Sequence, residues 1–337
     1  MIISVRRVMR WLRSASGRNT PSNSALTLAV TLAVTLHLAA CSAPKAATSA
    51  PAAVPGAPKV LAIETFLADI AQNVAGDRLT VEALVPIGVD PHAFEPTPTD
   101  IRKVAESEVL IANGAGFESF LEKLLQNADG QRLVIEASTG LVGRTPQGEE
   151  HAGEAEDEHE HENDPHFWLD PLSAVRYVEN IRDGLSQADP AGQDVYARNA
   201  EAYIGKLREL DTWIAGQVEQ VPEARRLLVT NHESFGYFAD RYGFHVVGTV
   251  IPSVSTGASP SAQQLAQLVD RLKATNAPAI FLETGANTQL ADQLAAETGI
   301  TIVTDLYTHS VTEPGGVAPT YIEMMRQNVQ KIVAALK

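Results

Sequence analysis

The chain has 337 residues, with 41 acidic against 26 basic side chains, a net charge of −15 and a single cysteine. That length is sufficient for two domains. The negative balance argues against nucleic acid as a partner, because phosphate backbones attract basic surfaces, whereas it suits a cation. One cysteine excludes an internal disulfide, so this residue needs another explanation.

The first 40 residues have the pattern of an export signal. Five arginines and no acidic residue precede an apolar run over residues 25–40, which ends at Leu38-Ala39-Ala40-Cys41. The pattern predicts a cleaved signal peptide with lipid attached to Cys41. The alternative, an uncleaved membrane helix, needs about 20 apolar residues. Residues 41–58 are rich in Ala, Pro and Ser, which predicts a flexible tether. We therefore expect the chain to act outside the cytoplasmic membrane, on the cell surface or in the periplasm.

Residues 59–188 alternate between helix-like and strand-like patterns. Apolar residues recur at helix spacing from Phe66 to Val74, Thr97-Pro98 has the form of a cap followed by a first-turn proline, and a third helix is expected over residues 117–125. Short apolar runs lie at residues 60–63, 79–84, 109–112 and 133–137. This alternation predicts a parallel sheet covered on both faces. In such sheets ligands gather at the carboxyl ends of the strands.

A long helix and a second lobe follow. Over residues 189–220 apolar side chains recur at intervals of three and four, from Tyr196 to Val218, which predicts a rigid helix between two lobes. In residues 221–337 we expect helices around Phe235, from Ser259 to Leu272 and from Tyr321 to Leu336, and strands at residues 227–230, 244–247, 279–282 and 300–303. The predicted fold class is α/β, with two lobes, each a parallel sheet covered by helices, joined by one long rigid helix.

Residues 147–164 interrupt the first lobe with an acidic insertion. It contains nine Asp or Glu, no Lys or Arg, and His151, His159 and His161. So many charges cannot be buried, which predicts a solvated, disordered loop. One interpretation is a charged insertion with incidental histidines. The other is an accessory collector of divalent metal, because imidazoles and carboxylates together suit such ions.

Four further histidines stand in rigid turns or just beyond expected strands. His92 and His166 each follow Asp-Pro, whereas His232 and His309 follow the runs at 227–230 and 300–303. Four converging imidazole nitrogens would form a tetrahedral zinc site with bonds of about 2.0–2.1 Å, and nitrogen ligands favour Zn²⁺ over Mn²⁺. The alternative is that one or two of them cap helices or fill a cleft. Two other histidines are not candidates, because we expect a structural role for His245 inside a strand and loss of His37 with the signal.

Three motifs carry a resemblance to a known family. They are residues 86–98, which begin Pro-Ile-Gly-Val-Asp-Pro-His, residues 164–171, Asp-Pro-His-Phe-Trp-Leu-Asp-Pro, and residues 232–243, which begin His-Glu-Ser-Phe-Gly-Tyr-Phe. From the lipobox to Leu336 the chain resembles the zinc- and manganese-binding solute-binding lipoproteins of ABC importers (metal-binding cluster A-I, or cluster 9).

The resemblance implies a monomer that binds Zn²⁺, or alternatively Mn²⁺, and delivers it to a permease and its ATPase. It also implies that His92, His166 and His232 are metal ligands. Many manganese-type members of the family have glutamate at the position of His232, so a histidine there looks zinc-type. The acidic insertion before the second motif also resembles that of zinc-type members, although it is short here.

The fourth ligand departs from the family pattern. The family has an aspartate after a Leu-aromatic-Ser/Thr segment, whereas here Leu306-Tyr307-Thr308 is followed by His309. Either His309 replaces the carboxylate, or an oxygen of Glu283 or Asp305 supplies the ligand. If His309 is the ligand, we expect nearby acids, Asp305 or Glu283, to offset the charge of the ion from outside the ligands.

Two other function classes are open to a chain with these residues. A secreted zinc hydrolase needs an open coordination position and a carboxylate base. His232-Glu233 fits that interpretation, but residue 236 is Gly, so there is no His-Glu-x-x-His pair. A metal-buffering adhesin would bind metal without a transporter. We predict a binding protein and not an enzyme. Turnover of ester or peptide substrates would favour the hydrolase, and a permease and ATPase encoded beside the chain would favour import.

Overall fold

The structure is a computed structural model that describes residues 56–144 and 163–337. The predicted signal peptide, Cys41, most of the tether, and His151, His159 and His161 of the acidic insertion lie outside the described residues. The described residues belong to one compact unit. Within the described part of the chain, no helix is long and apolar enough to cross a membrane.

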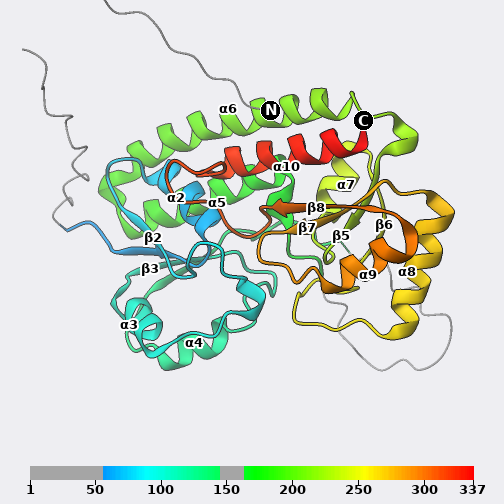
Figure 1. Ribbon diagram of the computed structural model, residues 1–337. Helices are drawn as coiled ribbons and strands as arrows, with labels where there is room; N and C mark the ends of the chain where they lie inside the picture. The colour runs from blue at the N-terminus through cyan, green and yellow to red at the C-terminus, as the bar shows by residue number, and fades with distance from the viewer. Residues whose placement is uncertain (1–55, 145–162) are drawn as a thin grey trace, which may run out of the picture. The chain divides into compact units, whose positions relative to one another are not determined.

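The first sheet has four parallel strands in the order β2-β1-β3-β4 (Figure 1). The strands are β1 (Val60–Ala62), β2 (Val81–Ala83), β3 (Val109–Ala112) and β4 (Leu133–Glu136). β1 and β3 are buried along their whole length, because helices cover both faces of the sheet. One face packs on α2 (Thr65–Ala75) and α5 (Pro171–Ala188), and the other packs on α3 (Pro98–Glu106) and α4 (Leu121–Asn127).

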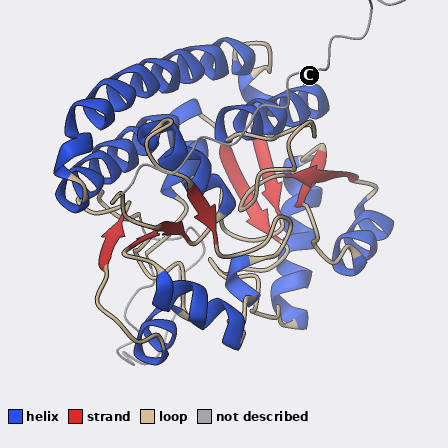
Figure 2. Ribbon diagram, turned by 90° about the vertical axis from the view of Figure 1, so that its left-hand side faces the viewer, coloured by secondary structure: helices blue, strands red, loops and turns tan. Residues whose placement is uncertain are grey.

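The second sheet repeats this plan with strands in the order β6-β5-β7-β8, again all parallel. Figure 2 shows helices packed around the strands of the molecule. The strands are β5 (Leu227–Thr230), β6 (His245–Thr249), β7 (Ala279–Glu283) and β8 (Thr301–Leu306). Its helices are α7 (Gly236–Tyr242) and α10 (Tyr321–Leu336) on one face, and α8 (Ala262–Thr275) and α9 (Gln289–Thr298) on the other.

The helix α6 (Gln193–Val218) joins the two halves. Its 26 residues correspond to a length of about 39 Å. It lies along α2 and α5 of the first half and along α10 of the second (Figure 1). The core beneath it includes residues of both sheets, among them Ile111 of β3 and Phe281 of β7. The predicted fold class, two α/β lobes joined by one long helix, is therefore confirmed. The lobe boundaries after residues 188 and 220 stay predictions.

All eight predicted strands are present, but the starts of three helices differ from the prediction. α4 begins at Leu121 and not at Phe117, because the Glu118 carboxylate accepts from backbone N–H groups of residues 113 and 114 and holds that segment in a turn. α8 begins after Ser261, whose hydroxyl accepts from the N–H of Gln264 at 3.2 Å. This capping box sets the start later than the predicted Ser259.

α6 also begins later than predicted. The N–H of Asp189 bonds to the carbonyl of Leu185 at 2.8 Å, so Asp189 closes α5. A 3₁₀ turn over Pro190–Gly192 then separates α5 from α6. The helices α5 and α9 were not predicted.

Candidate metal centre

The first half of the molecule presents His92 and His166 from two turns of the same construction. Asp90 Oδ1 accepts a hydrogen bond from the N–H of His92 at 2.9 Å, and Asp164 Oδ1 accepts one from the N–H of His166 at 3.0 Å. An aspartate that binds the N–H two residues later stabilises a tight turn, and the intervening proline fixes the backbone. Each Asp-Pro-His sequence therefore holds its histidine in a defined position.

The second half presents His232 and His309 just beyond the carboxyl ends of β5 and β8. β7 lies between these strands in the sheet and ends at Glu283. Oε1 of Glu283 lies 2.5 Å from Nδ1 of His232, and Oε2 lies 3.1 Å from Nδ1 of His309. Asn231 and Thr308 also donate hydrogen bonds to this carboxylate. One buried carboxylate therefore lies beside two imidazoles.

The four histidines from the two halves converge. Each offers one ligand atom, and these atoms all lie within 4.8 Å of one another. Nε2 of His166 is 3.4 Å from Nε2 of His92 and 3.2 Å from Nε2 of His232. A tetrahedral ion with bonds of about 2.0–2.1 Å has its ligand atoms about 3.3 Å apart, which these two separations match. Nε2 of His309 is buried without a hydrogen-bond partner among the described residues, so its lone pair is available to an ion.

Carboxylates accept at Nδ1 in two of the four rings. Asp164 Oδ1 lies 2.8 Å from Nδ1 of His166, and Glu283 has the same role for His232. Nδ1 of His309 lies 3.0 Å from Oγ1 of Thr308, which in turn donates to Glu283. A neutral imidazole whose Nδ1–H donates to a carboxylate carries its lone pair on Nε2. Histidines that bind metals in proteins are oriented by carboxylates in this way.

Burial keeps most of the cluster uncharged. Burial, together with the neighbouring His309 and His232, lowers the pKa of His92 to about 2. Burial also lowers the pKa of His166 and of His309. His232 differs, because burial lowers the pKa of this ring but Glu283, together with Asp90 and Asp164, raises it above its ordinary value. Protons therefore compete with a metal ion first at His232.

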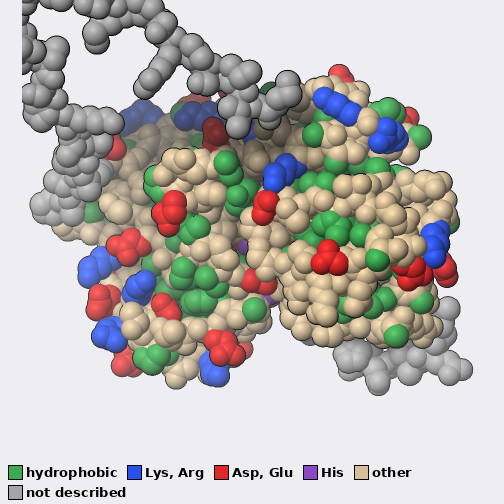
Figure 3. Space-filling model, viewed as in Figure 1, with side chains coloured by type: hydrophobic (Ala, Val, Ile, Leu, Met, Phe, Trp, Pro, Cys, Tyr) green, Lys and Arg blue, Asp and Glu red, His purple; other side chains and the backbone are tan. Residues whose placement is uncertain are grey.

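Two buried aromatic side chains pack against the cluster. The ring of Phe117 lies 4.9 Å from that of His92 and 5.6 Å from that of His166, and Trp168 lies 5.1 Å from His166, measured between centroids. Nε1 of Trp168 donates to the carbonyl of Thr308 at 2.7 Å, which ties the two halves together beside the site. On the face seen in Figure 3, histidine shows only as small areas at the seam between the halves. Because little water reaches the site, the electrostatic interactions among its groups are stronger than they would be in solution.

Glu283, Asp305 and His245 were also considered in the sequence analysis, and only Glu283 lies beside the histidine cluster. Glu283 contacts two of the histidines through their Nδ1 atoms. The structure does not bring Asp305 into the cluster, because its exposed carboxylate lies 3.6 Å from Nζ of Lys331. His245 lies in a strand as expected, as the exposed first residue of β6, and is not part of the cluster.

Asp164, Phe117 and Thr308 contribute to the site and were not predicted as site residues. Asp164 had a signal in the sequence, because it precedes His166 by two residues as Asp90 precedes His92. The roles of Phe117 and Thr308 depend on contacts between segments far apart in the chain, which no local pattern indicates.

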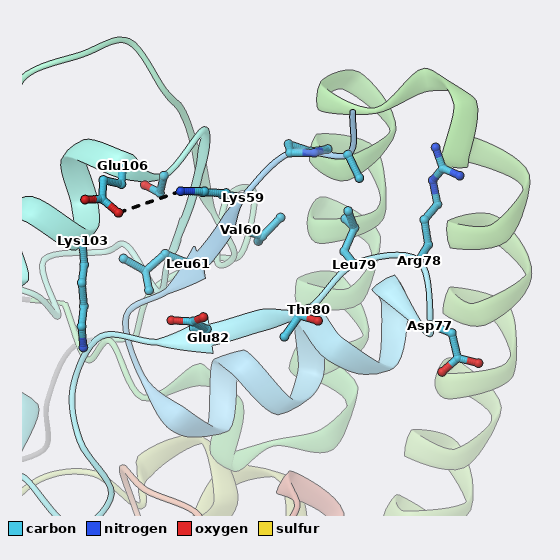
Figure 4. A pocket seen from close by; sticks show the side chains of 13 residues that line it. Lys59, Val60, Leu61, Asp77, Arg78, Leu79, Thr80, Glu82, Lys103 and Glu106 are labelled. Atoms are coloured by element: carbon cyan, nitrogen blue, oxygen red, sulfur yellow. Dashed lines mark ion pairs between the residues drawn. The ribbon is translucent and has the colours of Figure 1, made fainter. Parts of the chain in front are cut away.

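A separate hollow of about 300 Å³ opens where β1 and β2 begin, at the opposite edge of the first sheet (Figure 4). Three of its charged side chains are in ion pairs, Lys59 with Glu106 at 3.9 Å and Arg78 with Asp189. Among the described residues, the four-histidine group is the one cluster of His, Cys, Asp or Glu whose ligand atoms lie close enough together to hold a metal ion.

Comparison with known proteins shows which family the sequence matches. The family model for ZnuA, described as zinc-uptake complex component A, periplasmic, matches residues 60–335. The manganese-binding lipoprotein MntA of Halalkalibacterium halodurans is 36% identical over 278 residues, which is 82% of this chain and 88% of MntA. The manganese ABC transporter substrate-binding lipoprotein PsaA of Streptococcus pneumoniae serotype 4 is 30% identical over 284 residues, which is 82% of this chain and 89% of PsaA.

Solved structures give the same result. The periplasmic zinc-binding protein TroA of Treponema pallidum superposes with a TM-score of 0.74 and 27% identity, over 83% of this chain and 99% of TroA. The manganese-bound periplasmic metal-binding protein of Candidatus Liberibacter asiaticus superposes with a TM-score of 0.71 and 29% identity, over 83% of this chain and 100% of that chain. The chain therefore belongs to the ZnuA family, whose members are extracytoplasmic substrate-binding components of metal ABC importers and not enzymes.

Proposed function

We propose that the chain binds Zn²⁺ through His92, His166, His232 and His309 and delivers the ion to an ABC permease and its ATPase. The observation that carries the proposal is the convergence of four imidazoles, with no carboxylate oxygen in the group. Nitrogen ligands in tetrahedral geometry suit Zn²⁺, whereas Mn²⁺ favours oxygen ligands.

Two carboxylates just behind the imidazoles support this assignment. Neutral imidazoles bring no charge to offset a divalent cation. Glu283 contacts the Nδ1 atoms of His232 and His309, and Asp164 contacts that of His166, so negative charge lies one ring away from the ion. Carboxylates in this position raise the basicity of the rings and strengthen their bonds to a metal. From behind the rings they would supply the negative charge that the aspartate ligand at position 309 supplies in the family pattern.

Manganese is the second candidate, because MntA and PsaA are named for it. Metal analysis of protein purified without chelator, followed by competition of Zn²⁺ against Mn²⁺, distinguishes the two ions. Zinc in the purified protein and preferential binding of zinc would support the proposal. Preferential binding of manganese would contradict the choice of ion but not the site.

Replacing His309 with aspartate is expected to retain zinc binding and to improve manganese binding relative to wild type. The substitution exchanges one of four nitrogens for a charged oxygen ligand, which Mn²⁺ prefers. Competition titrations on both proteins measure the change as a lower ratio of zinc affinity to manganese affinity.

The matched control for this experiment is His245→Asp, the same substitution at an exposed histidine outside the cluster. It should leave the ratio of affinities at the wild-type value. An unchanged ratio in His309→Asp would remove His309 from the ligands. A metal-bound structure in which Glu283 takes the fourth position would do the same.

We also propose that the chain works as a lipid-anchored monomer, with the lipid on Cys41 and residues 41–58 as the tether. The lipoprotein names of MntA and PsaA support the anchor. The acidic insertion with His151, His159 and His161 is proposed as an accessory metal collector.

Deletion of residues 149–162 is expected to leave one tight zinc site and to remove weaker ones. The reason is that the four clustered histidines all lie outside the deleted segment. Calorimetric titration of the two proteins counts the sites and measures their affinities. Loss of the tight site on deletion would show that the insertion, and not the cluster, holds the ion.

A further inference from the structure

A cavity of about 420 Å³ leads from the surface to the histidine cluster. It reaches His309 and Glu283, and its walls come from both halves, with Asp90 on the first half and Thr256 on the second. Thr256 belongs to residues 250–261, which connect β6 to α8 without forming a helix or strand. His166 and His232 are completely buried, whereas this cavity lies between the halves and borders His309 of the cluster.

A hydrogen bond between Thr256 and Asp90 crosses this cavity, beside the one from the N–H of Gly88 to Oγ of Ser310. Oγ1 of Thr256 donates to Oδ2 of Asp90 at 2.5 Å. The other oxygen of Asp90 accepts from the N–H of His92 at 2.9 Å. A single carboxylate therefore connects a turn that carries a metal-site histidine to the segment on the opposite wall. Within the described part of the chain, Thr256 is the one side chain of residues 250–261 whose hydrogen bond reaches the first half.

We propose that Thr256 and Asp90 form a latch that slows the exchange of the bound ion. The proposal rests on metal binding by the histidine cluster. While the latch is closed, residues 250–261 stay against the first half and restrict the cavity. When it opens, the wall is free to move and the turn of His92 loses one of its restraints. Thr256 does not belong to the histidine cluster, so it acts as a positioning residue on the rates of entry and release.

Other bonds between the halves do not depend on this latch. The N–H of Gly88 donates to Oγ of Ser310 at 2.9 Å, and the N–H of Tyr321 donates to Oδ2 of Asp69 at 2.9 Å. The two halves also share the core beneath α6. Loss of the latch therefore leaves the halves joined and the four histidines in place, and its effect is confined to the cavity.

The test is the rate of zinc release from Thr256→Val, which keeps the branched shape and removes the hydroxyl. Zinc-loaded protein is mixed with excess fluorescent chelator in a stopped-flow instrument. Because the lost hydrogen bond goes to a charged group, release is expected to be on the order of 10-fold faster than in wild type. The rate of zinc entry should also rise, so the equilibrium affinity changes by less than either rate. Thr256→Ser retains the hydroxyl and should release zinc at nearly the wild-type rate.

Thr288→Val is the matched control, because it removes a Thr–Asp hydrogen bond of 2.9 Å, to Asp292, elsewhere in the same half. It should release zinc at the wild-type rate. An unchanged release rate in Thr256→Val would overturn the latch, as would an equal acceleration in Thr256→Ser or Thr288→Val. Wild-type protein that binds no zinc would overturn the proposed function together with the latch. The two failures are therefore distinguishable.

Discussion

Replacing His92 with alanine is expected to abolish most of the stabilisation that zinc gives the protein. Loss of one ligand should weaken binding by more than about 100-fold, since even residues behind the ligands contribute about 10–100-fold. At a zinc concentration of 100 times the wild-type Kd, binding stabilises the folded state by about 2.7 kcal/mol. In a variant with a 100-fold higher Kd, the same concentration gives only about 0.4 kcal/mol. The zinc-induced shift in Tm measures this difference.

His92 is the histidine best suited to this test. It is only partly buried, whereas His166 and His232 are completely buried, so their replacement by alanine also leaves cavities in the interior. His245→Ala is the control, because it removes an exposed imidazole from β6. It should retain the full shift in Tm. A full shift in His92→Ala would show that this residue is not a ligand.

Replacing Glu283 with glutamine is expected to weaken zinc binding at neutral pH by about 10–100-fold. The amide retains the shape of the side chain but removes the negative charge that faces His232 and His309. The site then holds a divalent cation among neutral rings with less charge behind them. Competition with a chelator of known affinity at pH 7 measures the loss.

The same variant should also change the pH dependence of binding. Protonated His232 cannot bind zinc, and Glu283 raises the pKa of His232 above its ordinary value. Zinc affinity of the wild-type protein should therefore fall as the pH decreases through that raised pKa. Glu283→Gln removes the charge of Glu283 while burial still lowers the pKa of His232, so the fall should occur at lower pH. Titrations at a series of pH values between about 5 and 8 cover the histidine range.

Asp305→Asn is the control for Glu283→Gln. It removes a carboxylate at the end of the neighbouring strand, but one that is exposed and lies beside Lys331. It should leave both the affinity and its pH dependence unchanged. Equal losses in the two variants would mean that a general loss of negative charge, and not contact with the imidazoles, explains the effect.

The strands, and the placement of the four histidines in rigid turns or just beyond strands, could be predicted from the sequence because both depend on local patterns. Short apolar runs reflect burial on both faces of a parallel sheet, and polar residues after those runs lie at the carboxyl edge. The role of Glu283 was less predictable. It lies beside two histidines because β7 lies between β5 and β8, and strand order is not a local property of the chain.

The two unpredicted helices have different explanations. α5 begins with Asp170 as its cap and Pro171 in its first turn, a clear start signal that was hidden because residues 164–171 also form a rigid turn. In α9 only Ala291 and Leu294 are buried, so its apolar periodicity is weak. The acid at position 305 was a reasonable candidate from its place after a strand, but its side chain faces solvent.

Because the two sheets share one core, release of the ion to a permease requires that part of the protein be deformed. α6 and the elements beneath it form a rigid shared core, because close-packed interiors resist compression. The outer layers are built on two smaller cores, around α3 and α4 in one half and around α8 and α9 in the other. We infer that a permease which pulls on the protein deforms these outer layers more easily than it deforms the shared core. The undeformed shared core would then return the histidines to their positions once the ion has left.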